Sequence, residues 1–124
     1  MTVPLDEAKE LVRRAVRVID GKKGRDIVIL RMTDVLPITD YFVIATGQNA
    51  RQLKAIVSEI YDQALELTGR KPFHVAGERG GQWVVMDYGS VIVHLFDEPT
   101  RKFYDLELLW GDAPRLDWQK VLSS

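Results

Sequence analysis

A run of five apolar residues, Tyr41–Ala45 (YFVIA), constrains the fold of this chain more than any other feature. A strand with one face in water alternates apolar and polar residues, whereas a strand covered on both faces is apolar throughout. The run therefore predicts a central strand with helices packed on both faces of its sheet. At 124 residues we expect one domain over 1–124, with a core of about 6–113 and a C-terminal tail at 114–124.

Helical periodicity appears on both sides of this run. Apolar residues recur at three- and four-residue steps before Gly21, and again between Asn49 and Gly69, where a glycine is a typical helix stop. Asn49 is placed to cap the second helix, and Gln52 to return the hydrogen bond. A third helix is predicted over Glu98–Trp110. The residues expected on its buried side are Phe103, Leu106, Leu109 and Trp110.

Four further segments are short and rich in β-branched or aromatic residues, which is typical of strands. They are Asp26–Met32, Phe73–Ala76, Gln82–Asp87 and Ser90–Phe96. Together with the central run they predict a mixed sheet of about five strands. Strands and helices alternate along the chain, so the predicted class is α/β, a single layered domain with helices flanking the sheet.

The segments Gln82–Asp87 and Ser90–Phe96 are predicted to form a hairpin around Tyr88-Gly89, with Trp83 opposite His94. Because side chains alternate across a strand, the hairpin has two unlike faces. One is wholly apolar and is predicted to face the core: Val84, Met86, Val91, Val93 and Leu95. The other mixes apolar and polar residues: Trp83, Val85, Asp87, Ser90, Ile92 and His94.

Two interpretations of the mixed face stay open. A face with apolar area, a Trp and a few polar groups is normal for the centre of a protein interface. Alternatively, a helix simply covers this face, and Trp83 is then a core residue. His94 is predicted to be a hydrogen-bonded interface or core histidine, since Asp87 lies too far along the hairpin to bond it directly in this register.

The sequence contains few residues that could form a catalytic or metal-binding site. The chain has no Cys and only two His, which leaves no thiol nucleophile and a weak case for a metal. We therefore expect no catalytic residue, no metal and no cofactor. The turn Thr46-Gly47, between a strand and a helix, could hold an anion. It keeps one alternative open, a nucleotide-binding protein or a degenerate nucleotidyltransferase-like enzyme, although the Asp-x-Asp pair that such enzymes use for metal ions does not occur.

Charge and hydropathy limit the partners. The formal net charge is −1, so no cationic field attracts nucleic acid in general, and we expect no sequence-specific nucleic acid binding. The N-terminal segment lacks the apolar core of a signal peptide. No apolar run approaches the ~20 residues that span a bilayer. We expect a cytoplasmic protein that does not enter a membrane.

Three blocks of sequence together resemble one family. They are ITDYFVIATG at Ile38–Gly47, GQWVVMDYGSVIVHLF at Gly81–Phe96 and RKFYDLELLW at Arg101–Trp110. In this order and spacing they are similar to the iojap family, the bacterial ribosomal silencing factors. The resemblance implies a small α/β domain related in topology to nucleotidyltransferases but without their catalytic carboxylates.

The resemblance also implies a function without catalysis. Family members bind the large ribosomal subunit at protein L-fourteen, on the surface that faces the small subunit. This sterically blocks subunit joining and represses translation during starvation or stationary phase. Members are often dimers in isolation, so a homodimer is expected here too.

Carried over to this chain, the binding surface of the family includes Trp83. We extend it to Val85, Asp87 and His94, which share its predicted face. The last predicted helix adds three residues spaced three apart: Arg101, Tyr104 and Glu107. Glu78 and Arg79, in the connection before Trp83, are predicted rim contacts. Trp118 and Leu122, in the tail, either dock on the sheet or lie near the ribosome.

Overall fold

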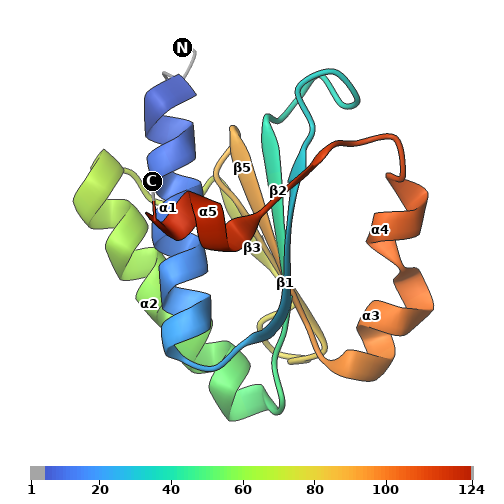
Figure 1. Ribbon diagram of the computed structural model, residues 1–124. Helices are drawn as coiled ribbons and strands as arrows, with labels where there is room; N and C mark the ends of the chain where they lie inside the picture. Colours follow the sequence, from blue (N-terminus) through green and yellow to red (C-terminus); the bar gives the residue numbers. More distant parts are fainter. Residues whose placement is uncertain (1–4, 124) are drawn as a thin grey trace.

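The computed structural model describes residues 5–123, with side chains from residue 7 onward (Figure 1). It contains one mixed sheet of six strands in the order β3-β4-β5-β2-β1-β6. β2 and β5 run parallel, and the other neighbouring pairs are antiparallel. The strands are β1 (Arg25–Arg31), β2 (Tyr41–Thr46), β3 (His74–Ala76), β4 (Trp83–Asp87), β5 (Val91–Phe96) and β6 (Arg115–Leu116).

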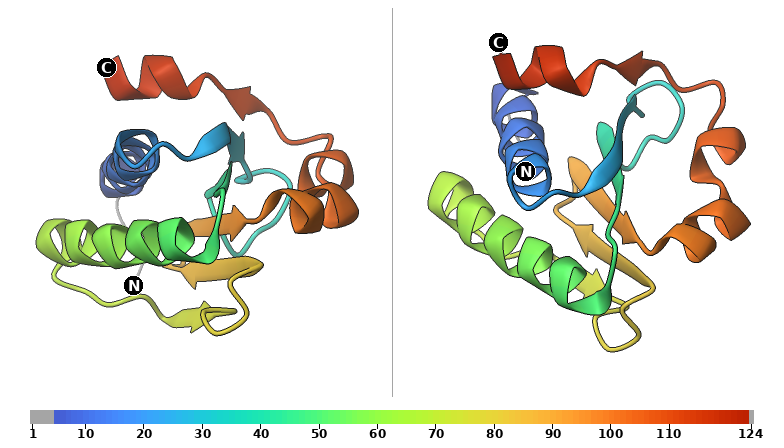
Figure 2. Two further views of the ribbon diagram at one scale, coloured as in Figure 1. Left: turned by 90° about the horizontal axis from the view of Figure 1, so that it is seen from below. Right: turned by 60° about the horizontal axis from the view of Figure 1, so that its bottom comes forward.

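Helices cover both faces of the sheet, as Figures 1 and 2 show. On one face lie the long helices α1 (Leu5–Gly21) and α2 (Ala50–Thr68), together with the short C-terminal helix α5 (Trp118–Ser123). On the other lie α3 (Glu98–Tyr104) and α4 (Leu106–Leu109). The predicted class, a single α/β domain with a mixed sheet flanked by helices, is confirmed.

The central strand is β2, as its apolar sequence predicts. All of its residues are buried. Tyr41, Val43 and Ala45 pack into the core beneath α1 and α2, whereas Phe42 and Ile44 pack into a second cluster on the α3–α4 face. Each face of this strand therefore belongs to a separate hydrophobic cluster, which is why residues 41–45 are all apolar or aromatic.

The long helices end where the sequence predicts. α1 stops at Gly21, and α2 stops before Gly69, whose φ of 70° lies in the left-handed region. Asn49 caps α2 by accepting a hydrogen bond from the Gln52 amide at 2.8 Å. The predicted return bond is wrong. Gln52 accepts from the Gln48 amide instead, and its amide group donates to the Lys22 and Lys23 carbonyls, which ties the start of α2 to the end of α1.

The hairpin register differs from the predicted one. Trp83 pairs with Phe96, Val85 with His94 and Asp87 with Ile92. The Tyr88 amide donates to the Val91 carbonyl at 2.9 Å, so the turn is Gly89-Ser90 rather than Tyr88-Gly89. Gly89 has a φ of 80° at the first turn position, and its amide donates to the Asp87 side chain. The slip of two residues along the partner strand keeps both predicted faces.

The predicted helix Glu98–Trp110 is interrupted. Asp105 has a φ of 47°, a left-handed conformation that ends α3, and its side chain accepts from the Leu108 amide at the start of α4. The break divides the predicted helix into two short ones, and the predicted buried side is wrong at two positions. Phe103 is 80% exposed and Leu109 67% exposed, while Leu106 is buried and Trp110 partly buried.

The C-terminal tail docks on the domain. The Arg31 amide donates to the Pro114 carbonyl, and β6 then pairs with β1. β6 is a sixth strand, which was not predicted from the sequence. Trp118 and Leu122 pack against the core on the α1–α2 face. Of the two alternatives for the tail, the structure shows the docked one.

Candidate docking surface

Trp83 lies at the centre of a group of rings on the α3–α4 face. Its ring centroid is 4.9 Å from that of Phe96 on β5 and 4.6 Å from that of Tyr104 on α3. Phe42 continues the group through His94 at 4.6 Å and Trp110 at 6.3 Å. We call this group the aromatic cluster. Its members are Phe42, Trp83, His94, Phe96, Tyr104 and Trp110.

The aromatic cluster combines the two interpretations of the mixed face. Trp83 is only partly buried. Tyr104 is the residue of the short helix α3 whose ring contacts the Trp83 ring. Tyr104 is itself 49% exposed. Stacked rings of this kind contribute about 0.5–1.5 kcal/mol beyond the area that they bury. Trp83 therefore packs between β5 and α3 and is still partly exposed to solvent.

His94 is a core histidine. Its side chain is buried, and the Trp83 indole Nε1 donates to His94 Nδ1 at 3.2 Å. His94 Nε2 is buried without a partner among residues 7–123. Burial lowers the pKa of His94 to about 4, so the ring is neutral at pH 7. The ring orients Trp83 from inside, and a partner could touch it only if the cluster opened.

Arg101 and Glu107 bond to each other. Arg101 Nε donates to Glu107 Oε1 at 3.1 Å, Nη2 forms an ion pair with the same oxygen at 3.0 Å, and Nη1 donates to the Thr46 hydroxyl at 2.8 Å. Their side chains are only 11% and 15% exposed. The three residues fasten α3 and α4 to the end of β2, the central strand. The predicted contact residues Arg101 and Glu107 thus hold in place the segment that carries Tyr104.

An apolar patch on α3 and α4 escaped the sequence analysis. Its members are Phe103 (80% exposed), Leu108 (77%), Leu109 (67%) and Tyr104 (49%). Phe103 and Tyr104 contact each other edge to face, with ring centroids 5.1 Å apart. The signal in the sequence was the apolar content of RKFYDLELLW, which a continuous helix would have buried. The break at Asp105 leaves these side chains in water.

Val85 and Asp87 lie on the less buried face of β4 with Trp83, as predicted. Both are partly buried. Asp87 accepts the Gly89 amide in the hairpin turn and pairs in register with His74 on the edge strand β3. Its carboxylate therefore already stabilises the turn.

Glu78 and Arg79 lie beside α2. They line a cavity of about 510 Å³ together with Leu53, Lys54 and Val84. Val84 belongs to the core on the α1–α2 face, so this cavity opens away from the aromatic cluster. The structure does not bring these two predicted rim residues together with Trp83.

The turn Thr46-Gly47 has little to offer an anion. The Gly47 amide donates to the Phe96 carbonyl at 2.8 Å, and the Gln48 amide donates to Gln52. The Thr46 hydroxyl accepts from Arg101. A Cβ at Gly47 would lie 2.5 Å from Leu53, which accounts for the glycine by packing. The Gly47 and Gln48 amides are therefore already bonded within the protein.

In the part of the chain that the structure describes, no three His, Asp or Glu side chains gather as metal ligands. Likewise, no helix between residues 5 and 123 is long and apolar enough to cross a bilayer.

Comparison with known proteins identifies relatives across almost the whole chain. A family model described as "Ribosomal silencing factor during starvation" matches residues 5–124. The chain is 39% identical to ribosomal silencing factor RsfS of Bacillus subtilis over 109 residues, which are 88% of this chain and 92% of that protein. It is 32% identical over 120 residues to chloroplastic protein Iojap of Arabidopsis thaliana, covering 94% of this chain and 49% of that one.

Two further matches extend the comparison. The chain is 32% identical over 105 residues to mouse "Mitochondrial assembly of ribosomal large subunit protein 1", covering 83% of this chain and 46% of that protein. A crystal structure of a Chromobacterium violaceum protein superposes with a TM-score of 0.76 at 31% identity, covering 82% of this chain and 84% of that one. The fold and the sequence thus point to the same relatives.

Proposed function

This chain belongs to the family of ribosomal silencing factors, which includes the iojap proteins, and from that premise we propose how it acts. We propose that it binds the large ribosomal subunit at protein L-fourteen and sterically blocks joining of the small subunit. It thereby represses translation when nutrients are short. The name of the mouse relative, an assembly factor of the mitochondrial large subunit, supports the choice of subunit.

The observation that carries this proposal is the apolar patch next to the aromatic cluster. Large apolar side chains gathered on one surface mark interaction sites on monomeric proteins. Here Phe103 and Leu108 are more than three-quarters exposed, and Phe103 contacts Tyr104, whose ring lies tilted against that of Trp83. Aromatic anchors surrounded by apolar side chains are where binding energy concentrates at protein interfaces.

Each predicted site residue has a role in this proposal. Trp83 and Tyr104 form the anchor, and Val85 and Asp87 extend it along β4. His94 orients Trp83 from below. Two residues act indirectly, since the Arg101–Glu107 pair holds α3 and α4 in place. Glu78 and Arg79 are proposed rim contacts only if the partner also reaches round to α2.

The proposed mechanism needs no catalysis and no cofactor. The nucleotide-binding alternative would use the Thr46-Gly47 turn, whose donors are bonded internally. Nothing in the structure favours that alternative. A homodimer in isolation and a cytoplasmic location belong to the same proposal. If the dimer covered the apolar patch, it would have to dissociate before the chain bound a ribosome.

The direct test is sedimentation of the purified protein with separated ribosomal subunits. We expect the protein to comigrate with the large subunit alone and to prevent its joining to the small subunit. Trp83→Ala should weaken binding by about 2–4 kcal/mol, a ~30- to 1,000-fold loss of affinity. Phe103→Ala, which removes an exposed side chain, should cost about tenfold without changing stability.

The matched control is Phe73→Ala. Phe73 is 76% exposed, like Phe103, but it precedes the edge strand β3 and lies outside the apolar patch. Equal losses for Phe73→Ala and Phe103→Ala would show that the patch is not the binding surface. Comigration with neither subunit would refute the proposed function itself.

A further inference from the structure

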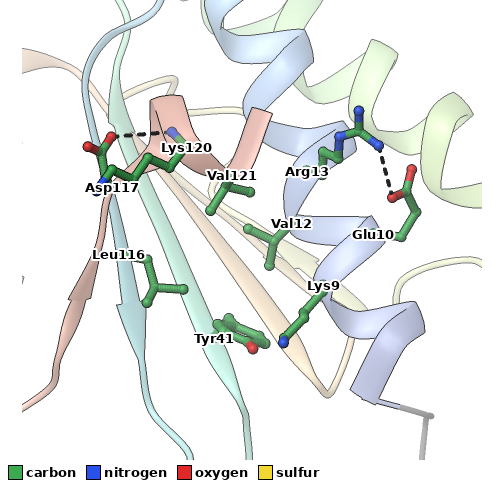
Figure 3. A pocket seen from close by; sticks show the side chains of 9 residues that line it. All are labelled: Lys9, Glu10, Val12, Arg13, Tyr41, Leu116, Asp117, Lys120 and Val121. Carbon is green, nitrogen blue, oxygen red and sulfur yellow. Dashed lines mark hydrogen bonds and ion pairs between the residues drawn. The ribbon is translucent and has the colours of Figure 1, made fainter. Parts of the chain in front are cut away.

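A cavity of about 450 Å³ lies on the α1–α2 face, away from the apolar patch. It opens between α1, the start of β2, β6 and α5, as Figure 3 shows. Ligand sites typically have volumes of about 300–1,000 Å³, so a small organic molecule fits this space. Nothing in the proposed function uses this cavity.

The walls of the cavity are apolar. Val12 of α1, Leu116 of β6 and Val121 of α5 line it, and Val12 is almost fully buried. The ring of Tyr41 forms the floor and is 4% exposed. A ligand that fills this space must therefore have an apolar body.

One end of the cavity is polar. Figure 3 shows the Tyr41 hydroxyl and the Lys9 ammonium at the same end. Neither group has a hydrogen bond or an ion pair with any residue that the structure describes. Burial raises the pKa of Tyr41, so the hydroxyl keeps its proton and can donate. A protonated phenol beside this ammonium group is suited to an anion.

The remaining charges of the cavity change this little. Glu10 lies 3.6 Å from both Arg13 and Arg14, and in Figure 3 it faces Arg13 away from Lys9. Asp117 accepts the Gln119 and Lys120 amides at the start of α5. Lys120 adds another cation to the lining. Both carboxylates have partners, whereas Lys9 has none among the side chains that the structure describes, which are those of residues 7–123.

We propose that this cavity is a binding site for a small amphipathic monoanion. The carboxylate of such a ligand contacts Lys9 and accepts from the Tyr41 hydroxyl, and its hydrocarbon body lies against Val12, Leu116 and Val121. The site is independent of the ribosome-binding proposal, because it lies on the other face of the sheet and is tested without ribosomes.

The test measures binding of octanoate to the full chain by calorimetry, with acetate, 1-octanol and octylammonium as comparison probes. Octanoate should bind best, because only it combines the apolar body with the negative charge. Tyr41→Phe keeps the ring and removes one hydrogen bond worth ~1 kcal/mol, so affinity should fall about fivefold. Lys9→Gln should lower affinity about threefold, a loss that shrinks with added salt.

Matched controls are Tyr61→Phe and Lys71→Gln. Tyr61 lies at the other large cavity and Lys71 is exposed elsewhere, so octanoate affinity should not change. The proposal is overturned if octanoate does not bind, if octanol or octylammonium binds as well, or if acetate binds equally. It is also overturned if the controls lose as much affinity as the cavity variants.

Discussion

The two faces of the sheet are covered by helices of very different length. On one face, α1 has 17 residues and α2 has 19, and together they bury a continuous apolar core. On the other, α3 has 7 residues and α4 has 4, and of their apolar side chains only Leu106 is buried. Phe103 and Leu108 remain in water as a result. One face stabilises the fold, and the other leaves apolar area free for a partner.

The short helices are held by polar and aromatic contacts rather than by burial. Arg101 bonds Thr46 and Glu107, and the ring of Tyr104 contacts that of Trp83 at a tilt. A long amphipathic helix needs no such device, because its apolar stripe holds it on the sheet. Substitutions that affect the packing of one face and not the other can test this difference between the two faces.

The largest expected effect comes from the long-helix face. Ile56 of α2 is fully buried, and Ile56→Ala should lower the free energy of unfolding by about 2–5 kcal/mol. Leu109→Ala on α4 removes a side chain that is 67% exposed and should change it by less than ~0.5 kcal/mol. Urea unfolding of both variants measures the contrast. Equal destabilisation would mean that Leu109 is buried in solution and that the two faces do not differ.

The second prediction concerns acid. The pKa of His94 is lowered to about 4 by burial, from 6.5 in an unfolded chain. Between these values the unfolded state binds the extra proton and the folded state does not. Stability is therefore full above pH 6.5 and is lost as the pH falls toward 4. The loss from this group should reach about 3 kcal/mol.

Unfolding curves from pH 7 to pH 4 test this, with His94→Gln as the variant that cannot titrate. The variant should lose the part of the pH dependence that lies between 6.5 and 4. His74, which is exposed on β3, provides the control His74→Gln, and that substitution should leave the curve unchanged. A wild-type slope that persists in His94→Gln would assign the effect to other groups.

The third prediction compares the contributions to stability of two ion pairs on the short-helix face, Arg101–Glu107 and Lys102–Glu98. Arg101→Gln removes the link between α3, α4 and β2 and leaves Glu107 without its cation, at a cost of about 2 kcal/mol. Lys102→Gln removes an ion pair with Glu98 in which both side chains are at least half exposed, and should cost less than ~0.5 kcal/mol.

Arg101→Gln should also lower ribosome affinity more than Lys102→Gln, because of these two residues only Arg101 fastens the helix that carries Tyr104 to β2. If both substitutions were equally mild, α3 and α4 would be held by the aromatic contacts alone.

The apolar periodicity of the two long helices made the long-helix face predictable. The ends of α1 and α2, the Asn49 cap and the buried strand β2 all follow from residues that are close in sequence. β6 was missed because it is two residues long, and its pairing with β1 depends on tertiary contacts. The hairpin register was missed because Gly89 fits either turn position, and only the pairing of Tyr88 with Val91 selects the first.

Prediction of the candidate site was partial for a related reason. Trp83 and Tyr104 were predicted to share one surface, and in the structure their ring centroids lie 4.6 Å apart. Arg101 and Glu107 were chosen as outward contacts, whereas they bond to each other. Phe103 and Leu109 were assigned to the core, because a continuous helix would place them there. A left-handed Asp105 is a single-residue event that helical periodicity cannot reveal.

The pairing of β6 with β1 has a consequence for how the chain folds as it is synthesised. Ile29 lies opposite Leu116, so these two strands meet across the four strands that lie between them in the sequence. One edge of β1 stays unpaired until those four strands have been synthesised, and closing so long a loop is slow. β6 is thus the last of the six strands to be synthesised, and its pairing completes the sheet and covers the exposed edge of β1.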